Sequence, residues 1–210
     1  MRFYLVRHGE TLLNAEHVRQ GEGGSLSSRG KEQAERVGDS LARFPIRQII
    51  SSPFERAKET AFIINEHLHV PVVYSDLFVE RKNPSEVIGK KTYDPEVSAI
   101  VDKIENSYHD DTYRYSDEEN FIDLKMRAKK ALAYLAWHGS KETCVVTHHV
   151  ILKMLISYLL YRDRLTARDY AKLSFFNISD NAGISILDYH PWRMLNATRG
   201  WEVVSYNETP

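Results

Sequence analysis

The sequence predicts an α/β fold that is built around a parallel sheet. Two observations carry this prediction. Short apolar runs that are rich in strand-forming residues recur along the chain, beginning with residues 3–6. Over residues 3–74 these runs alternate with amphipathic helical patterns, and such alternation is typical of parallel sheets whose helices cross over between strands.

The order of the elements follows from hydrophobic spacing and from residues that end helices. In the first long helix, Ala34, Val37 and Leu41 recur at steps of three or four residues, and Pro45 ends the pattern. The stretch 14–28 is polar and rich in glycine, so we expect a loop there. Strands are expected at residues 3–6, 46–50, 70–74, 143–147, 184–187 and 201–206, the last two as a hairpin-like finish. Helices are expected at residues 28–44, 54–68, 94–104, 116–137 and 150–161.

Length and charge limit the possible functions. The chain has 210 residues, of which 42% are hydrophobic and 27% are charged, so it can form one sizeable core and we expect a single domain over residues 1–210. Lys and Arg total 28 against 29 Asp and Glu, which gives a net charge of -1. This balance provides no general attraction for nucleic acid or for an anionic membrane, so an anionic ligand would have to be bound by local arginines.

The sequence is expected to belong to a cytoplasmic protein. Cys144 is the only cysteine, so no intrachain disulfide is possible, and its apolar surroundings indicate a core residue in a reducing compartment. A strand that begins at residue 3 leaves no room for a signal peptide, and no apolar run has the length of a membrane span.

Residues 75–116 break the strand–helix pattern and are expected to form a lid or insert. Glu80 follows an apolar run within this segment, which suggests a partly buried carboxyl group near a strand end. Ser116 or Asp117 is expected to cap the helix at 116–137. The segment also carries tyrosines and cations that suggest an anionic or aromatic phosphate ester as substrate; the cations are Lys82, Lys90, Lys91 and Arg114.

Two strands end where a histidine begins the next turn or helix. Arg7-His8-Gly9 follows the first strand, and His148-His149 follows the strand at 143–147. Arg56 lies in the first turn of a helix after another strand, where the helix N-terminus attracts anions. Ligands of open α/β sheets bind at this carboxyl edge of the strands. A guanidinium binds phosphate oxygens, and a neutral imidazole is a nucleophile or base near pH 7, so the sequence predicts an anion site there.

Each of these residues also has a structural explanation. The histidines could be core or capping residues and the arginines could be solvated surface groups. Two adjacent histidines could also bind a metal. However, neighbours at a strand–helix junction point in different directions and the sequence has no partner at ligand spacing, so we expect no metal site.

Several motifs then carry a resemblance in combination: Val6-Arg7-His8-Gly9-Glu10-Thr11 with Asn14; Leu26-Ser27-Ser28-Arg29-Gly30 with Gln33-Ala34; Ser51-Ser52-Pro53 with Arg56-Ala57 and Thr60-Ala61; Glu119 with Arg127; Val145-Val146-Thr147-His148; and Asn181 with Ile184 to Leu187. Together they resemble the histidine phosphatase superfamily, whose signature is the Arg-His-Gly (RHG) motif and which includes the cofactor-dependent phosphoglycerate mutases. The resemblance implies a three-layer α/β/α sandwich, with a mostly parallel sheet and a late antiparallel strand.

The resemblance also implies catalytic roles. His8 would be the nucleophile that forms phosphohistidine, and Arg7, Arg56 and His148 would bind the phosphoryl oxygens. Glu80 would donate a proton to the leaving oxygen. Glu86 is a weaker rival for that role, because the chain from Glu80 to the next glycine is longer than is common in the family.

The resemblance further implies contacts to the substrate or its phosphate. The residues expected to line the phosphate pocket are Asn14, Gln20 and Gly21. His149 stands where family members often have glycine, so it either contacts the substrate or packs against the fold.

Three functions compete on these grounds. The compact chain favours a metal-independent phosphatase that hydrolyses a small phosphorylated metabolite and needs no cofactor. The alternatives are a cofactor-dependent phosphoglycerate mutase and a non-catalytic phosphate-binding module, although the presence of His8, Arg56 and His148 favours catalysis. The expected partner is a small-molecule phosphate ester, with no nucleic acid or membrane. The aromatic-rich lid and the C-terminal hairpin are candidate surfaces for a homodimer.

Overall fold

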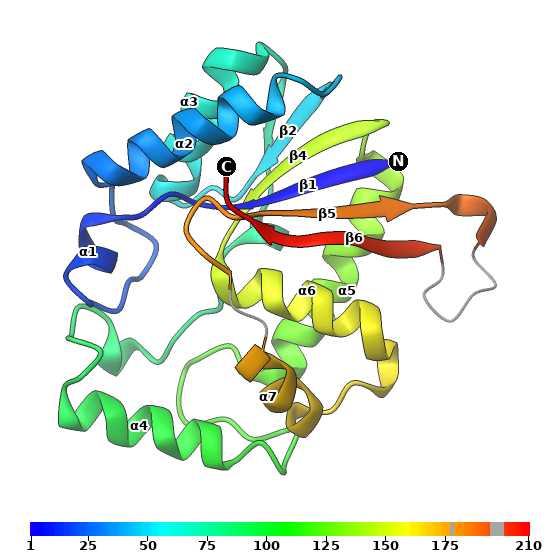
Figure 1. Ribbon diagram of the computed structural model, residues 1–210. Helices are drawn as coiled ribbons and strands as arrows, with labels where there is room; N and C mark the ends of the chain where they lie inside the picture. The colour runs from blue at the N-terminus through cyan, green and yellow to red at the C-terminus, as the bar shows by residue number, and fades with distance from the viewer. Residues whose placement is uncertain (177–178, 194–199) are drawn as a thin grey trace.

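The computed structural model describes residues 1–176, 179–193 and 200–210, which form a six-stranded sheet with helices on both faces (Figure 1). The strands are β1 (Arg2–Arg7), β2 (Gln48–Ser51), β3 (Val72–Tyr74), β4 (Glu142–Thr147), β5 (Ile184–Tyr189) and β6 (Trp201–Glu208). The helices are α1 (Leu12–Ala15), α2 (Ser28–Leu41), α3 (Glu55–Leu68), α4 (Pro95–Asn106), α5 (Phe121–His138), α6 (His149–Tyr161) and α7 (Ala167–Phe176). Short 3-10 turns are η1 (Asp76–Phe78), η2 (Ser85–Val87), η3 (Arg162–Arg164) and η4 (Pro191–Arg193).

The sheet has the strand order β3-β2-β4-β1-β5-β6. The first four strands in this order run parallel to one another, whereas β5 is antiparallel to both of its neighbours, β1 and β6. The expected α/β/α sandwich with a mostly parallel sheet and a late antiparallel strand is therefore confirmed.

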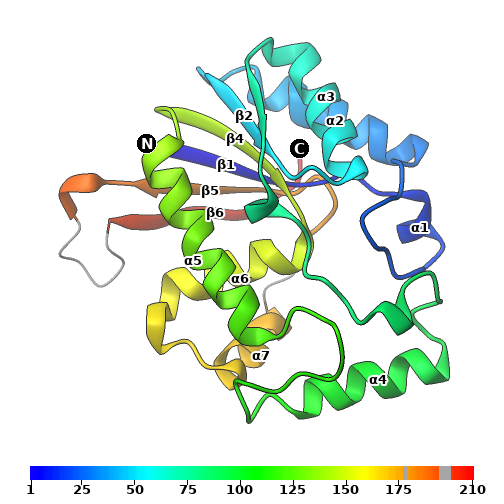
Figure 2. The same cartoon turned by 180° about the vertical axis from the view of Figure 1, so that it is seen from behind.

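Alternate residues of the central strands pack against opposite layers. Phe3 and Leu5 of β1 belong to the core beneath α5 and α6, whereas Tyr4 and Val6 belong to the core beneath α2 and α3. Figures 1 and 2, seen from opposite sides, show these helix pairs on the two faces of the sheet. Cys144 is a buried core residue, as predicted, and burial raises the pKa of its thiol to about 12.

The N-terminus of α5 differs from the prediction. The helix is capped by Asn120, which forms a capping box with Asp123. The carboxylate of Glu118 accepts hydrogen bonds from the backbone N–H groups two and three positions before it, at 2.7 and 2.6 Å. These bonds hold the preceding residues in a turn, so the prediction that Ser116 or Asp117 caps the helix is wrong.

The sequence did not indicate two of the helices. α1 is a single turn that overlaps the start of the expected loop at 14–28 and is held by a capping box between Thr11 and Asn14. α7 is a short helix, and it is secured by Leu165, Ala167 and Tyr170, which join the core beside α6. Within the described parts of the chain, no helix combines the length and apolar character that crossing a membrane requires.

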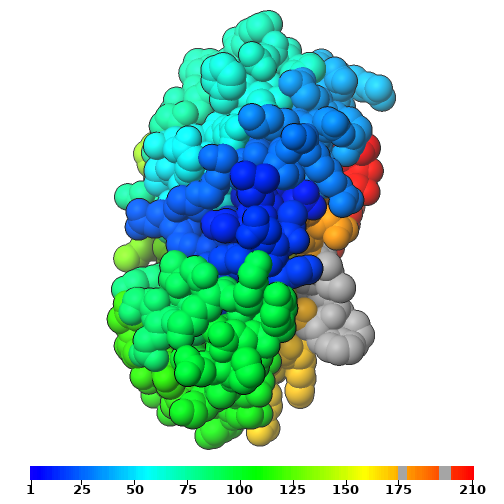
Figure 3. Space-filling view, turned by 90° about the vertical axis from the view of Figure 1, so that its left-hand side faces the viewer, coloured from blue at the N-terminus to red at the C-terminus, as the bar shows by residue number. Residues whose placement is uncertain are grey.

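The segment 75–116 forms η1, η2 and α4 and packs against the loop that follows β1 (Figure 3). The Arg19 N–H donates to the carbonyl oxygen of Lys90 at 2.9 Å. Val18 and Lys91 form an isolated antiparallel bridge. In Figure 3 the green residues of this segment lie directly below the blue N-terminal residues and against them.

Candidate active site

The parallel strands deliver the predicted residues to one edge of the sheet. β1, β2 and β4 are aligned so that they end at the same level, and the residues that follow them are His8, Ser52 and His148. Arg56 lies in the first turn of α3, which follows β2, and Glu80 follows η1. The structure therefore brings together residues that are far apart in the sequence.

His8 is a buried imidazole in cationic surroundings. Its side chain is nearly inaccessible, and its ring centroid lies 5.1 Å from that of His148. Its Nδ1 lies 2.7 Å from the carbonyl oxygen of Gly9, and because a carbonyl oxygen only accepts, Nδ1 carries the proton and Nε2 keeps a free lone pair. Burial, followed by the charges of Arg56 and Arg7, keeps the pKa of His8 well below 6.5, so the imidazole is neutral at pH 7.

The turn that carries this histidine is fixed by its neighbours. The Gly9 N–H donates to Thr60 Oγ1 at 3.1 Å, and Asn181 Nδ2 donates to the carbonyl oxygen of His8 at 3.1 Å. A Cβ on Gly30 would lie 2.0 Å from the carbonyl oxygen of Glu10, so glycine is required where α2 meets the turn. The turn is thus positioned by α2, by α3 and by the residues before β5.

His148 is fully buried at the start of α6. Its Nε2 lies 2.7 Å from Ser52 Oγ, and its Nδ1 has no hydrogen-bond partner among the described residues. Burial and then nearby positive charges keep the pKa of His148 well below 6.5. A buried polar atom without a partner is costly, and an incoming ligand can provide the missing partner.

Two guanidinium groups lie beside this histidine pair. Arg56 is almost completely buried and donates from Nη1 to the carbonyl oxygen of Gly21 at 2.9 Å, and Arg7 donates from Nη1 to the carbonyl oxygen of Ser179. In the described part of the chain, Nε of both arginines is buried without a partner. Burial lowers the pKa of both, that of Arg56 to about 10, so both stay cationic at pH 7. Poorly hydrated cations with spare donors favour an anionic ligand.

Of the two candidate proton donors, Glu80 is the one that faces this group. Both of its carboxylate oxygens lie 3.1 Å from the N–H of Val150 at the N-terminus of α6, and Oε1 also accepts from the N–H of Arg81 at 2.8 Å. Glu86 is exposed and accepts from the hydroxyl of Tyr115 at 3.2 Å. Hence only Glu80 is within the site.

A partly buried ion pair holds the loop that carries Glu80. Arg127 of α5 donates from Nε and Nη2 to the two carboxylate oxygens of Glu119, each at 2.6 Å, and both side chains are only 15% exposed. Arg127 also donates from Nη1 to the carbonyl oxygens of Val79 at 2.7 Å and Leu77 at 3.2 Å. The backbone just before Glu80 is therefore fastened to α5.

Two cavities flank Glu80 and are within the size range of small-molecule sites. The first, which we call the cationic cavity, has a volume of about 650 Å³ and lies between α4, α6 and α7. Its charged and histidine residues are Arg19, Glu80, Arg81, Glu105, His149 and Lys153. The second, the loop cavity, has a volume of about 620 Å³ and shares Glu80, Arg81 and Asn83 with the first.

Three of the four predicted substrate contacts line one of these cavities. Gln20 and Gly21 line the loop cavity. Asn14 lines neither cavity, because its Oδ1 accepts from the N-cap N–H of α1 at 3.2 Å. His149 lines the cationic cavity with its Nδ1 2.8 Å from Ser179 Oγ, and burial lowers its pKa to about 4.

Sequence reasoning missed three polar residues of this region. Ser52 stood in a quoted motif without a role, and Arg19 lies in a loop without periodicity. Lys153 could have been found, because it follows His149 by four residues and therefore shares its helix face. The cations that the sequence did single out form surface ion pairs instead: Lys82, Lys90, Lys91 and Arg114.

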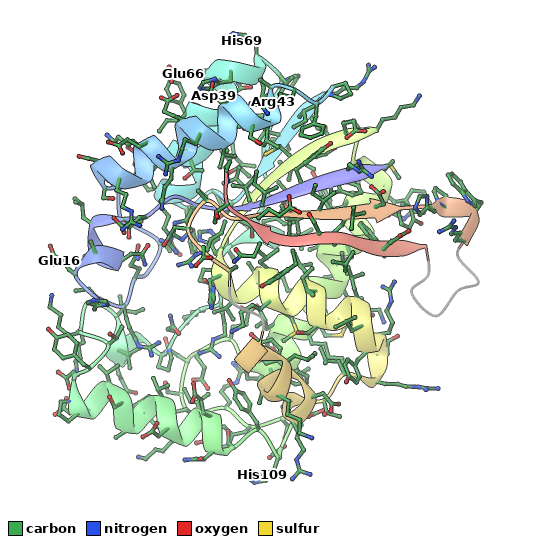
Figure 4. The ribbon with its side chains drawn as sticks, in the orientation of Figure 1. Glu16, Asp39, Arg43, Glu66, His69 and His109 are labelled. Atoms are coloured by element: carbon green, nitrogen blue, oxygen red, sulfur yellow. The ribbon has the colours of Figure 1, made fainter. Side chains whose placement is uncertain are left out.

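The described residues include no cluster that could bind a metal ion: in residues 1–176, 179–193 and 200–210, no three His, Cys, Asp or Glu side chains are placed to hold one. Figure 4 shows His69 and His109 at opposite extremes of the molecule, far from the sheet edge. Other labelled residues on the periphery are Glu16, Asp39, Arg43 and Glu66.

Comparison with known proteins gives matches along almost the whole chain. The chain is 32% identical over 220 residues to the protein named probable phosphoglycerate mutase GpmB of Salmonella typhi, which covers 100% of this chain and 96% of that protein. It is 46% identical over 78 residues to the uncharacterized phosphatase PhoE of Bacillus subtilis (strain 168), which covers 37% of this chain and 40% of that protein.

Solved structures show the same fold. The alpha-ribazole phosphatase from Shigella flexneri has a TM-score of 0.79 at 21% identity, covering 100% of this chain and 97% of that chain. A mycobacterial glucosyl-3-phosphoglycerate phosphatase has a TM-score of 0.79 at 21% identity, covering 98% of each chain. A family model matches residues 3–208, as the resemblance led us to expect, and the chain therefore belongs to the histidine phosphatase superfamily (branch 1).

Proposed function

We propose that this chain is a metal-independent phosphomonoester hydrolase, which acts on a small phosphorylated metabolite through a phosphohistidine at His8. The observation that carries the proposal is the state of His8, a neutral imidazole with a free Nε2 lone pair beside the guanidinium groups of the buried Arg56 and the half-buried Arg7. Phosphoryl transfer needs an in-line nucleophile and positive charge on the equatorial oxygens, and little other covalent chemistry. Membership of a family with phosphatase-named relatives supports the proposal.

In the first step, the lone pair of His8 Nε2 attacks phosphorus and the bond from phosphorus to the ester oxygen breaks. The electron pair stays on the ester oxygen, which takes a proton from the carboxyl group of Glu80. Arg7 and Arg56 donate to the phosphoryl oxygens. His148 donates from Nδ1, since Nε2 is satisfied by a serine hydroxyl. At an effective dielectric of 20, two opposite unit charges about 4 Å apart contribute roughly 4 kcal/mol, which is a substantial share of a catalytic barrier.

In the second step, water attacks the phosphorus of phosphohistidine. Glu80, now ionised, takes a proton from this water as the nitrogen–phosphorus bond breaks, and the electron pair returns to Nε2 of His8. Inorganic phosphate leaves and the starting protonation states are restored. One carboxyl group thus serves as acid and then as base.

The test is phosphate release from a panel of phosphomonoesters in the presence of EDTA. We expect release that survives EDTA and falls at least about a thousandfold in His8→Ala, because the nucleophile is lost. Protein quenched in alkaline denaturant should carry a phosphoryl group that is stable to base, labile to acid and absent from the same variant. Release that requires a divalent metal, or that persists in His8→Ala, would contradict the proposal.

Phosphoglycerate mutase activity is the second candidate, and the GpmB relatives support it through their name. A mutase would convert 3-phosphoglycerate to its 2-isomer after priming with bisphosphoglycerate, with little release of phosphate. Conversion faster than hydrolysis would replace the phosphatase proposal. Binding of phosphate without either activity would leave the non-catalytic module.

We also infer that residues 75–116 act as a lid within a single domain that covers residues 1–210. The supporting observations are the bridge between Val18 and Lys91 and the contribution of this segment to both cavities. Amide hydrogen exchange in this segment should slow when vanadate, a phosphate analogue, is added. Unchanged exchange there, alongside slower exchange at the sheet edge, would remove the lid from the proposal.

A further inference from the structure

Three cationic side chains from separate parts of the chain face the cationic cavity. Arg19 comes from the loop after α1, Arg81 directly follows Glu80, and Lys153 lies on α6. Among the described residues, the side chains of Arg19 and Lys153 have no hydrogen-bond or ion-pair partner, and Nε of both arginines is buried without one. Their charges are thus available to a molecule that enters the cavity.

This arrangement of cations lowers the stability of the protein when no ligand is bound. Burial lowers the pKa of Lys153 and of Arg19, and the charge of Arg81 lowers that of Arg19 further. Glu105, which is exposed, and Glu80 oppose these effects only in part. Cations kept close together in a cavity at a cost to stability are typical of a binding site.

The rest of the cavity wall is largely apolar or aromatic. Val101 and Ile104 line it from α4, together with Tyr108 and Tyr170. The volume of about 650 Å³ exceeds what a phosphate alone needs, so the cavity has room for an organic group. Glu80 also lines it, which connects the cavity to the place where the ester oxygen leaves.

We propose that the cationic cavity binds the alcohol portion of the substrate, and that Arg19, Arg81 and Lys153 bind a second anionic group on it, a carboxylate or a phosphate. The inference rests on the proposed hydrolysis at His8. It narrows the substrate class to phosphomonoesters whose alcohol carries a further negative charge beside an apolar or aromatic body. A guanidinium fork and an ammonium suit either anion.

The experiment compares esters that differ only in that charge. The carboxylate pairs are 3- and 4-carboxyphenyl phosphate, each against its methyl ester; hydroquinone bisphosphate against its monophosphate tests a second phosphate. We expect kcat/KM for at least one anionic ester to exceed that of its partner by roughly tenfold or more, as a charged hydrogen bond contributes. Lys153→Met and Arg19→Met should each lower this ratio severalfold.

Lys172→Met is the matched control, because it removes the same charge from an exposed site on α7 next to the cavity wall. It should leave the ratio unchanged. Lys153→Met should unfold at the same temperature or a higher one, since it removes a poorly solvated charge; a lower temperature would indicate a structural role instead. A ratio near one in the wild type, or an equal ratio in Lys153→Met, overturns the inference.

The outcomes keep the two proposals apart. If the uncharged esters are hydrolysed and His8→Ala abolishes this, the proposed function stands even when the ratio is one. If no ester is hydrolysed, the proposed function fails, and calorimetry on the wild type with the same esters decides the inference. Binding of the anionic esters no tighter than of their partners then overturns it.

Discussion

Replacing Arg127 by methionine should both destabilise the fold and impair catalysis, because this side chain joins α5 to the loop of Glu80. The change leaves the carboxylate of Glu119 without its bidentate partner at 2.6 Å. It also leaves the carbonyl oxygens of Val79 and Leu77 without their donor. Methionine keeps much of the side-chain length, so the effect reports on charge and hydrogen bonds rather than on an empty volume.

The expected magnitude follows from burial. Both partners are 15% exposed, and removing one of them leaves poorly hydrated polar groups unpaired, so the change should cost about 2–3 kcal/mol. Glu119→Leu combined with Arg127→Met removes both charges, so we expect the double variant to be at least about 1 kcal/mol more stable than the sum of the single changes predicts. Misplacement of Glu80 by about 1 Å should lower kcat/KM roughly a hundredfold.

Urea denaturation of the wild type, the two single variants and the double variant measures the coupling, and phosphate release measures the effect on Glu80. The matched control is Lys129→Met, which breaks an ion pair on the same helix with side chains 43% and 54% exposed and should cost at most about 1 kcal/mol. Equal losses of stability in Arg127→Met and Lys129→Met would refute the reasoning. So would strict additivity in the double variant, or full activity in Arg127→Met.

Three further predictions concern Ser52, the two buried histidines of the site, and Gly30. Ser52→Ala removes the 2.7 Å partner of His148 Nε2 and should lower kcat/KM roughly tenfold in the phosphate-release assay; an unchanged value would remove Ser52 from the site. The pKa values of His8 and His148 lie well below 6.5 in the folded protein, so the unfolded chain binds more protons below that pH. The free energy of unfolding should therefore be highest above about pH 6.5, and below that pH it should decrease by up to about 1.4 kcal/mol per pH unit for each histidine. Urea denaturation between pH 7.5 and 5.5 measures this decrease, which should be smaller in His148→Asn. Gly30→Ala forces a Cβ to 2.0 Å from a backbone carbonyl oxygen and should cost at least about 1–3 kcal/mol, whereas Gly23→Ala meets nothing within 4 Å and should cost less; equal thermal stability of the two variants would count against the close packing.

The sequence predicted the framework of the fold because that framework is local. Each central strand is an apolar run, and both of its faces are buried, so its pattern needs no information from elsewhere. The start of α5 was predicted wrongly because the carboxylate of Glu118 bonds to the backbone before it, and such a bond competes with the helix without changing hydrophobic periodicity.

The site divides in the same way. His8, Arg56 and His148 could be placed because each directly follows a strand or begins the next helix, and parallel strands end at one edge. The choice between Glu80 and Glu86 could not be made from the sequence, since it depends on which side of a long loop meets α6. Arg19 lies about 130 residues from Lys153 in the chain, and only the tertiary fold brings both to one cavity.

The candidate site derives its preference for anions from interactions that the protein leaves incomplete. His148 Nδ1 and the Nε atoms of Arg7 and Arg56 are buried without hydrogen-bond partners in the described residues. Such groups cost stability, yet the surrounding contacts are well satisfied: the Gly9 turn is hydrogen-bonded on both sides, and the loop of Glu80 is fastened to α5. Because the framework cannot relax to pair these donors internally, their hydrogen-bonding capacity stays directed at the sheet edge, where the proposed phosphoryl group would satisfy several of them at once.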